Sequence, residues 1–110
     1  MRKAKVFVQG RYAGELTEET GLAYRFVYDE AYTGPPVSLT MPVREKMFLY
    51  NRFPPFFDGL LPEGTQLEGL LKQAKIDRND LLSQLLTVGE DLVGAVTVRP
   101  EEDFSQDTTP

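Results

Sequence analysis

The chain has 110 residues, of which 41% are hydrophobic and 26% charged, and its formal net charge at pH 7 is −5. This length fits one domain with a single modest core. Because the sequence contains neither His nor Cys, it excludes disulfides, zinc sites built on those ligands, and nucleophilic catalysis by Cys or by a Ser–His pair.

The charge is unevenly placed along the chain. Residues 101–110 hold four of the 17 acidic residues and none of the 12 basic ones, so residues 1–99 are close to neutral. A nearly neutral body offers no basic stripe for a phosphate backbone, so we do not expect direct binding to nucleic acid. The sequence also has no apolar run long enough to cross a bilayer and no signal-peptide pattern, so we expect no membrane partner and a cytoplasmic location.

A β-hairpin and a third strand are predicted at the beginning of the chain. Residues 4–9 contain the Val and Phe side chains typical of a strand, and residues 12–17 can return as the second arm after a turn at Gly10 and Arg11. Large apolar side chains then alternate over residues 22–28, which is the period of a strand with one buried face. These strands are expected to form an antiparallel sheet.

A loop and a short strand are predicted next. Residues 33–36 contain two prolines, which fix φ and remove two hydrogen-bond donors, so they should form a loop. Residues 37–41 can then form a short strand that Pro42 closes. The chain changes character at Phe53, after which the patterns favour helices.

Two helices are predicted after Phe53. A short one covers residues 56–61, with prolines suited to its first turn and Pro62 at its end. In the next, Thr65 and Glu68 have the spacing of a capping box. Its apolar stripe consists of Leu67, Leu70, Leu71 and Ala74.

A third helix and a late strand complete the predicted fold. The helix should begin at Asp77 and end at Gly89, a natural C-terminal stop, and its buried stripe consists of Leu81, Leu82, Leu85 and Leu86. Residues 92–98 return as a strand that rejoins the sheet, and Gly94 within it indicates a bulge or the close approach of another backbone.

The predicted fold class is α+β, a small antiparallel β-sheet with a two-to-three-helix segment packed on it. We expect one domain over residues 1–99. Residues 100–110 have too few apolar side chains to offset the entropy of ordering them, so a flexible acidic tail is expected there.

The motifs that suggest chemistry are weak. Residues 59–65 have the glycine spacing of a phosphate-binding loop, but Thr65 stands where the phosphate-reaching Lys must be and no strand precedes the segment. Three carboxylate pairs have nothing nearby to desolvate them, so surface positions are the expected interpretation. They are Glu18 with Glu19, Asp58 with Glu63, and Glu90 with Asp91. We therefore expect no catalytic residue, metal or cofactor, and no enzyme activity.

Aromatic residues are concentrated between residues 47 and 57. Burial in the core is expected for most of them, because aromatic side chains dominate burial in small domains. One small core must, however, also hold the leucines of the helices, so part of residues 56–61 and the turn at residues 62–64 is expected on the surface. An exposed apolar patch with a polar rim is typical of a protein interface.

Four segments, in this order, resemble the amino-terminal region of the HipA kinase family. They are the hairpin over residues 6–16, the proline-bracketed residues 36–42 (PVSLTMP), residues 56–63 (FFDGLLPE), and the helix with its glycine–acid–strand element over residues 80–96. The third segment is similar to the family's most recognisable motif. The match runs from about residue 4 to residue 99.

The resemblance implies a binding protein, because the phosphate-binding and catalytic segments of HipA kinases are absent from this sequence. This is the pattern of HipS, the small antitoxin of three-gene Hip systems, in which the kinase toxin HipT is a separate chain and HipB binds DNA. It implies a chain that binds and inhibits a HipA-like Ser/Thr kinase. A HipB-like DNA-binding protein is the further partner that it suggests, in a ternary complex. The surface expected to face the kinase consists of Phe56, Phe57, Asp58, Leu60, Leu61, Pro62, Glu63, Gly64 and Thr65.

Two other functions stay open. A small basic cluster at one end of the chain favours a nucleic-acid-binding adaptor or repressor component. It consists of Arg2, Lys3, Lys5 and Arg11. A structural fragment of a split kinase that retains no inhibitory action is the other alternative.

Overall fold

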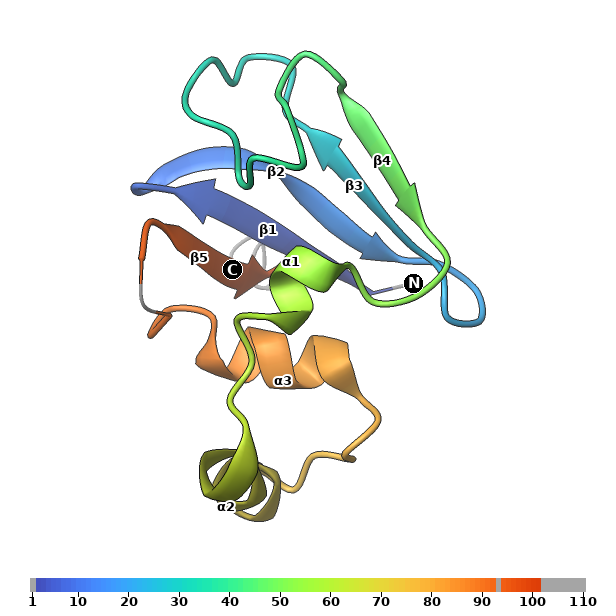
Figure 1. Ribbon diagram of the computed structural model, residues 1–110, viewed down its shortest axis with the longest axis vertical. Helices are drawn as coiled ribbons and strands as arrows, with labels where there is room; N and C mark the ends of the chain where they lie inside the picture. Colours follow the sequence, from blue (N-terminus) through green and yellow to red (C-terminus); the bar gives the residue numbers. More distant parts are fainter. Residues whose placement is uncertain (1, 93, 102–110) are drawn as a thin grey trace, which may run out of the picture.

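A computed structural model describes residues 2–92 and 94–101 of the chain and shows an antiparallel sheet with helices against one of its faces (Figure 1). The strands are β1 (Lys3–Val8), β2 (Arg11–Glu18), β3 (Tyr24–Tyr28), β4 (Met47–Tyr50) and β5 (Val96–Pro100), in the spatial order β4-β3-β2-β1-β5. The helices are α1 (Pro55–Asp58), α2 (Gly64–Ala74) and α3 (Leu81–Val88). The predicted α+β fold class is confirmed.

The predicted hairpin, third strand and late strand are confirmed, with small changes at their ends. The turn between β1 and β2 lies at Gln9 and Gly10, whose φ angles of 51° and 81° suit a tight hairpin. Leu22 lies before β3 and is 76% exposed, so the buried alternation begins only at Tyr24. Gly94 lies in a bend before β5 instead of within the strand, and its φ of 109° is one that glycine adopts readily.

The strand predicted over residues 37–41 is wrong, because these residues form a turn. The Val37 amide donates to the Tyr28 hydroxyl over 2.9 Å, and that hydroxyl donates to the Met41 carbonyl. Backbone groups that a neighbouring strand would pair are therefore bound locally. The strand that pairs with β3 is β4, which the sequence pattern did not predict, and Phe26 lies opposite Phe48 in that pair.

One face of the sheet forms the core together with α1 and α3. Side chains of β1, β3 and β5 alternate between buried and more exposed positions, as expected for a sheet covered on one side, whereas β2 has two pairs of adjacent buried residues. The helices contribute Phe57, Leu82 and Leu85 to this core, and the three side chains are fully buried. Burial of the α3 stripe is confirmed for Leu82 and Leu85, whereas Leu81 and Leu86 are partly buried.

Helix starts differ from the sequence prediction at both longer helices. In α2 the cap position is Glu63, with no side-chain cap bond, so Thr65 lies within the first turn and the capping box is wrong. In α3 the cap is Asp80, which accepts a 3.2 Å bond from the Ser83 amide. Asp77, predicted to begin the helix, instead accepts from the Asn79 amide at 2.7 Å in the preceding loop.

The predicted tail falls mostly outside the described part of the chain. Pro100 is the last residue of β5 and lies opposite Ala4, and the Glu101 amide donates to the Lys3 carbonyl at 3.2 Å, so these first two residues of the predicted tail are paired with β1. Residues 102–110 are not among the described residues, and the flexible acidic tail stays a prediction there.

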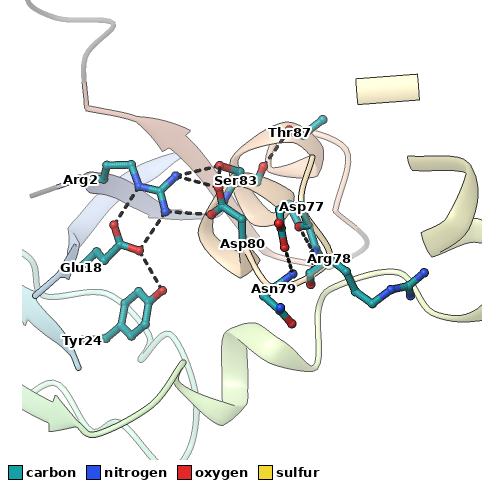
Figure 2. Close-up of polar contacts among 10 residues, drawn as sticks. Arg2, Glu18, Tyr24, Asp77, Arg78, Asn79, Asp80, Ser83 and Thr87 are labelled. Atoms are coloured by element: carbon teal, nitrogen blue, oxygen red, sulfur yellow. Dashed lines mark hydrogen bonds and ion pairs between the residues drawn. The ribbon is translucent and has the colours of Figure 1, made fainter. Parts of the chain in front are cut away.

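A polar network joins the beginning of the chain to β2 and α3 (Figure 2). The Arg2 guanidinium donates to Glu18 at 2.8 and 2.9 Å, to Asp80 at 2.8 Å and to the Ser83 hydroxyl at 2.8 Å. The Tyr24 hydroxyl also donates to Glu18, at 3.2 Å. Hydrogen bonds from Arg2 lower the pKa of Glu18, whereas burial opposes ionisation of Asp80 but is outweighed by bonds from Arg2 and Ser83, so its pKa is lowered too.

Replacing Arg2 with Gln is expected to make the domain less stable in a pH-dependent way. Carboxyls with lowered folded-state pKa values stabilise the fold above their unfolded pKa values of about 4, and this contribution is lost as pH falls through the folded values. Because the network is partly exposed, we expect a loss of roughly 1 kcal/mol at pH 7. Urea denaturation of both proteins should show this difference shrinking as pH falls below about 4.

Arg78→Gln is the matched control for this prediction. It removes the 2.7 Å ion pair with Glu68, in which both side chains are more than half exposed. Such a pair should contribute only a few tenths of a kcal/mol. A loss in Arg2→Gln that stays constant from pH 7 to pH 3 would contradict the assigned role of the two carboxylates.

Candidate protein-binding surface

Helix α1 begins with two prolines and ends in a hydrogen-bonded turn. Pro54 is buried before the helix and Pro55 occupies its first turn, where a missing amide costs nothing. The Gly59 amide donates to the Pro55 carbonyl at 3.0 Å and ends the helix. Four residues are too few for a stable isolated helix, so packing of its side chains on the sheet holds α1 in place.

The candidate residues of α1 and the following turn divide into two faces. Phe57 is fully buried, with its ring 6.2 Å from that of Phe26, and Leu61 is 8% exposed, so both belong to the core. Phe56 and Leu60 are half-buried and pack against the edge of that core. The remaining candidates form a polar rim around them: Pro62 is half-buried, and Asp58, Glu63, Gly64 and Thr65 are exposed.

Helix α2 adds an apolar surface that sequence reasoning assigned to the core. No residue of α2 is buried, and Leu67, Leu70 and Leu71 are each half-buried, while Ala74 is exposed. The helix has its main contacts with α3 and lies at the end of the molecule opposite β4 (Figure 1). We call the exposed and half-buried residues of 56–74 the α1–α2 surface. The leucine spacing predicted the apolar stripe of α2, but it did not show that the stripe lies outside the buried core.

A shallow hollow of about 170 Å³ lies beside α1. It is lined by the apolar residues Phe53, Pro55 and Leu81 and by the exposed charged residues Arg52 and Asp58. Its size and composition suit an apolar side chain of another protein better than a cofactor. Within residues 2–92 and 94–101 no three carboxylates come close enough to hold a metal ion.

The basic cluster at the beginning of the chain is engaged in contacts within the domain. Arg2 bonds Glu18 and Asp80, and the Lys3 ammonium lies 3.8 Å from Glu15. The cations of Lys5 and Arg11 lie over the rings of Tyr12 and Tyr32, at 5.0 and 5.4 Å from the ring centroids. These contacts weigh against a phosphate-binding role, because cations already paired attract a nucleic acid less strongly. Among the described residues, no helix is both long and apolar enough to cross a membrane.

Comparisons with known proteins agree with the resemblance seen in the sequence. The family model for the HipA N-terminal domain matches residues 4–99. A solved structure titled N-terminal domain of HipA toxin has a TM-score of 0.73 and 33% identity, and the match covers 93% of this chain and 94% of that one.

Relatives of this chain differ greatly in length. An uncharacterized protein of Haemophilus influenzae is 33% identical over 102 residues, covering 93% of this chain and 95% of that protein. The putative kinase Y4mE of Sinorhizobium fredii is 29% identical over 106 residues, but only 25% of its length is covered. The putative kinase Y4dM of the same organism is 37% identical over 87 residues, with 21% of its length covered. The chain thus spans a quarter or less of these two putative kinases. Because the family model matches residues 4–99, the chain belongs to the HipA N-terminal domain family.

Proposed function

We propose that this chain binds a separate HipA-like Ser/Thr kinase in the cytoplasm and inhibits it, acting as a non-catalytic antitoxin. The observation that carries the proposal is the occurrence of this domain in two settings. It forms about a quarter of the putative kinase Y4mE, and it accounts for 95% of the Haemophilus protein. A domain found both inside a putative kinase and as nearly all of a short protein is suited to bind a kinase from which it is absent.

The α1–α2 surface supports this proposal physically. When two regions belong to one chain, the apolar surface between them is covered, and an isolated region must cover that surface in another way. The α1–α2 surface contains half-buried Phe56 and Leu60, with exposed Asp58 between them in the sequence, and the half-buried leucines of α2, which follow exposed Thr65. Such a surface retains affinity for a kinase core, and binding inhibits if it favours an inactive conformation or covers the active site.

Inhibition is tested with the HipA-like kinase of the same genome, freed of any copy of this domain. Co-expression of this chain is expected to restore growth of cells that produce the kinase, and the purified chain should reduce phosphorylation in proportion to complex formed. Binding without any loss of phosphorylation would favour the structural-fragment alternative. Salt-sensitive retention on DNA without kinase binding would favour the nucleic-acid alternative.

Thr65→Arg is expected to weaken kinase binding at least tenfold while the domain stays folded. Thr65 is exposed in the first turn of α2, so a longer charged side chain disturbs an apolar interface but not the core. The added positive charge near a helix N-terminus costs the fold less than about 1 kcal/mol. Titration calorimetry measures binding, and far-UV circular dichroism checks the fold. Leu61 is unsuitable for this test, because it is buried.

Thr20→Arg is the control for Thr65→Arg. Thr20 is exposed in the turn between β2 and β3, away from α2. It should leave kinase affinity unchanged. Equal affinities of the wild-type, Thr65→Arg and Thr20→Arg proteins would place the kinase interface elsewhere on the domain.

A further inference from the structure

We propose that residues 37–41, the Leu39 turn, form a preformed plug that inserts the Leu39 side chain into an apolar pocket of the same kinase core. This inference rests on the proposed function and adds a second contact to the α1–α2 surface. Leu39 is 94% exposed, more than any other large apolar side chain in the described residues. The residues on either side of it are held unusually firmly.

Both ends of the turn are anchored in the core. Val37 and Met41 are buried, and both are bound by the hydroxyl of Tyr28, which accepts from the Val37 amide and donates to the Met41 carbonyl. The Tyr28 ring is itself buried and stacks on Tyr32, with the centroids 6.0 Å apart and the planes 3° from parallel. The turn therefore has a fixed position relative to β3.

Hydrogen bonds within the turn fix its shape as well. The Met41 amide donates to the Ser38 carbonyl at 2.9 Å, and the Ser38 hydroxyl lies 3.0 Å from the Thr40 hydroxyl and accepts from the Thr40 amide at 3.3 Å. Prolines at positions 35, 36 and 42 restrict the backbone on both sides. A leucine presented on such a turn loses little backbone entropy when it binds, so less of the free energy of its burial in a partner is offset by ordering.

The Leu39 turn and α1 cover the same face of the sheet, side by side. Met41 is bound to Tyr28, Phe57 of α1 packs near Phe26, and the rings of Phe26 and Tyr28 are 4.9 Å apart. In Figure 1 the loop between β3 and β4 descends over the sheet on the side where α1 lies. One partner body that contacts the α1–α2 surface can therefore reach the Leu39 turn as well.

Size and charge favour a kinase pocket over other occupants. One protruding leucine between two inward-facing anchors offers far less area than the roughly 1,200 Å² that a stable interface buries, so its partner must also contact the α1–α2 surface, as the proposed kinase does. The segment that returns from the turn carries exposed Arg44 and Lys46 against a single anion, Glu45, although the whole chain has a net charge of −5. The expected partner surface is an apolar pocket whose rim is neutral or acidic.

The test compares leucine substitutions in binding to the kinase core that lacks this domain. Leu39→Ser is expected to weaken binding at least tenfold in titration calorimetry, and Leu39→Met should stay within about threefold of wild type because it keeps the apolar volume. Leu22→Ser is the matched control, since Leu22 is 76% exposed in the turn between β2 and β3. It should bind as wild type does. Thermal unfolding should be the same for all of these proteins.

The outcomes separate the two proposals. If the wild-type chain does not bind the kinase core, the proposed function fails and this inference fails with it. If wild type binds and Leu39→Ser binds equally well, only the Leu39 turn is wrongly assigned. A wild-type dimer in sedimentation that Leu39→Ser dissociates, with kinase binding intact, would also overturn the inference, because the occupant would then be a second copy of this chain.

Discussion

Replacing Phe57 with alanine is expected to lower the free energy of unfolding by about 3–5 kcal/mol. The side chain is fully buried, and its ring lies 6.2 Å from Phe26 on the sheet and 5.2 Å from Phe56. Because α1 is too short to be stable alone, the ring is also what holds the helix against β3. The loss is a large share of what a domain of this size has in total. Urea denaturation followed by circular dichroism measures it.

Phe56→Ala is the control on the same helix. Phe56 is half-buried at the edge of the core, so its removal should cost less than half as much as removal of Phe57. The same substitution should weaken kinase binding, because Phe56 belongs to the α1–α2 surface. Equal losses of stability in the two variants would mean that the two rings are not divided between the core and the surface as the structure places them.

Spacing alone could have divided these residues before the structure was known. Phe57 and Leu61 are four residues apart, as are Phe56 and Leu60, so each pair is predicted to share a face of a helical segment. The surface expected from the sequence to face the kinase instead contained both pairs. Which pair faces the sheet depends on the direction in which α1 lies, and Pro54 and Phe26 fix that direction from outside the motif.

The turn at residues 37–41 shows why a correct period can still give a wrong element. Val37, Leu39 and Met41 alternate with Ser38 and Thr40, which is the pattern of a strand with one apolar face. In the structure the two outer apolar residues are buried and Leu39 points into solvent. The difference comes from the Tyr28 hydroxyl, nine residues before Val37, and no local pattern contains a contact over that separation.

Helix α2 shows the same limit for a helical period. Leu67, Leu70 and Leu71 do form one stripe, and the helix itself was predicted from them. Amphipathicity indicates that one side of a helix is apolar, but it does not indicate whether that side faces the helix's own domain or another protein. In this chain the packing of α2 on α3 leaves the stripe only half-buried.

Gly89→Ala is expected to lower the free energy of unfolding by roughly 1–3 kcal/mol through overpacking. The sequence suggested that Gly89 ends α3 because glycine adopts left-handed backbone conformations, yet its φ is −57°, which any residue can adopt. Glycine is needed at this position because there is no space for a Cβ. A Cβ at this position would lie 2.1 Å from the Val98 carbonyl oxygen and 2.9 Å from its carbon, both backbone atoms of β5. The variant must move the end of α3 away and lengthen the 3.0 Å bond from the Val98 amide to the Gly89 carbonyl.

Gly59→Ala distinguishes lack of space from the general effect of replacing a helix-ending glycine. Gly59 ends α1 with a φ of −66°, close to that of Gly89, but a Cβ there would lie 3.5 Å from the Phe56 carbonyl oxygen, an ordinary contact. Alanine restricts the unfolded chain at both sites, so Gly59→Ala should be neutral or stabilising by up to about 1 kcal/mol. Opposite signs for the two variants in urea denaturation would identify the approach of α3 to β5 as the constraint. If both variants were stabilising, α3 could move away from β5 without lowering the free energy of unfolding. The close packing of the last helix on the last strand would then not be required by the fold.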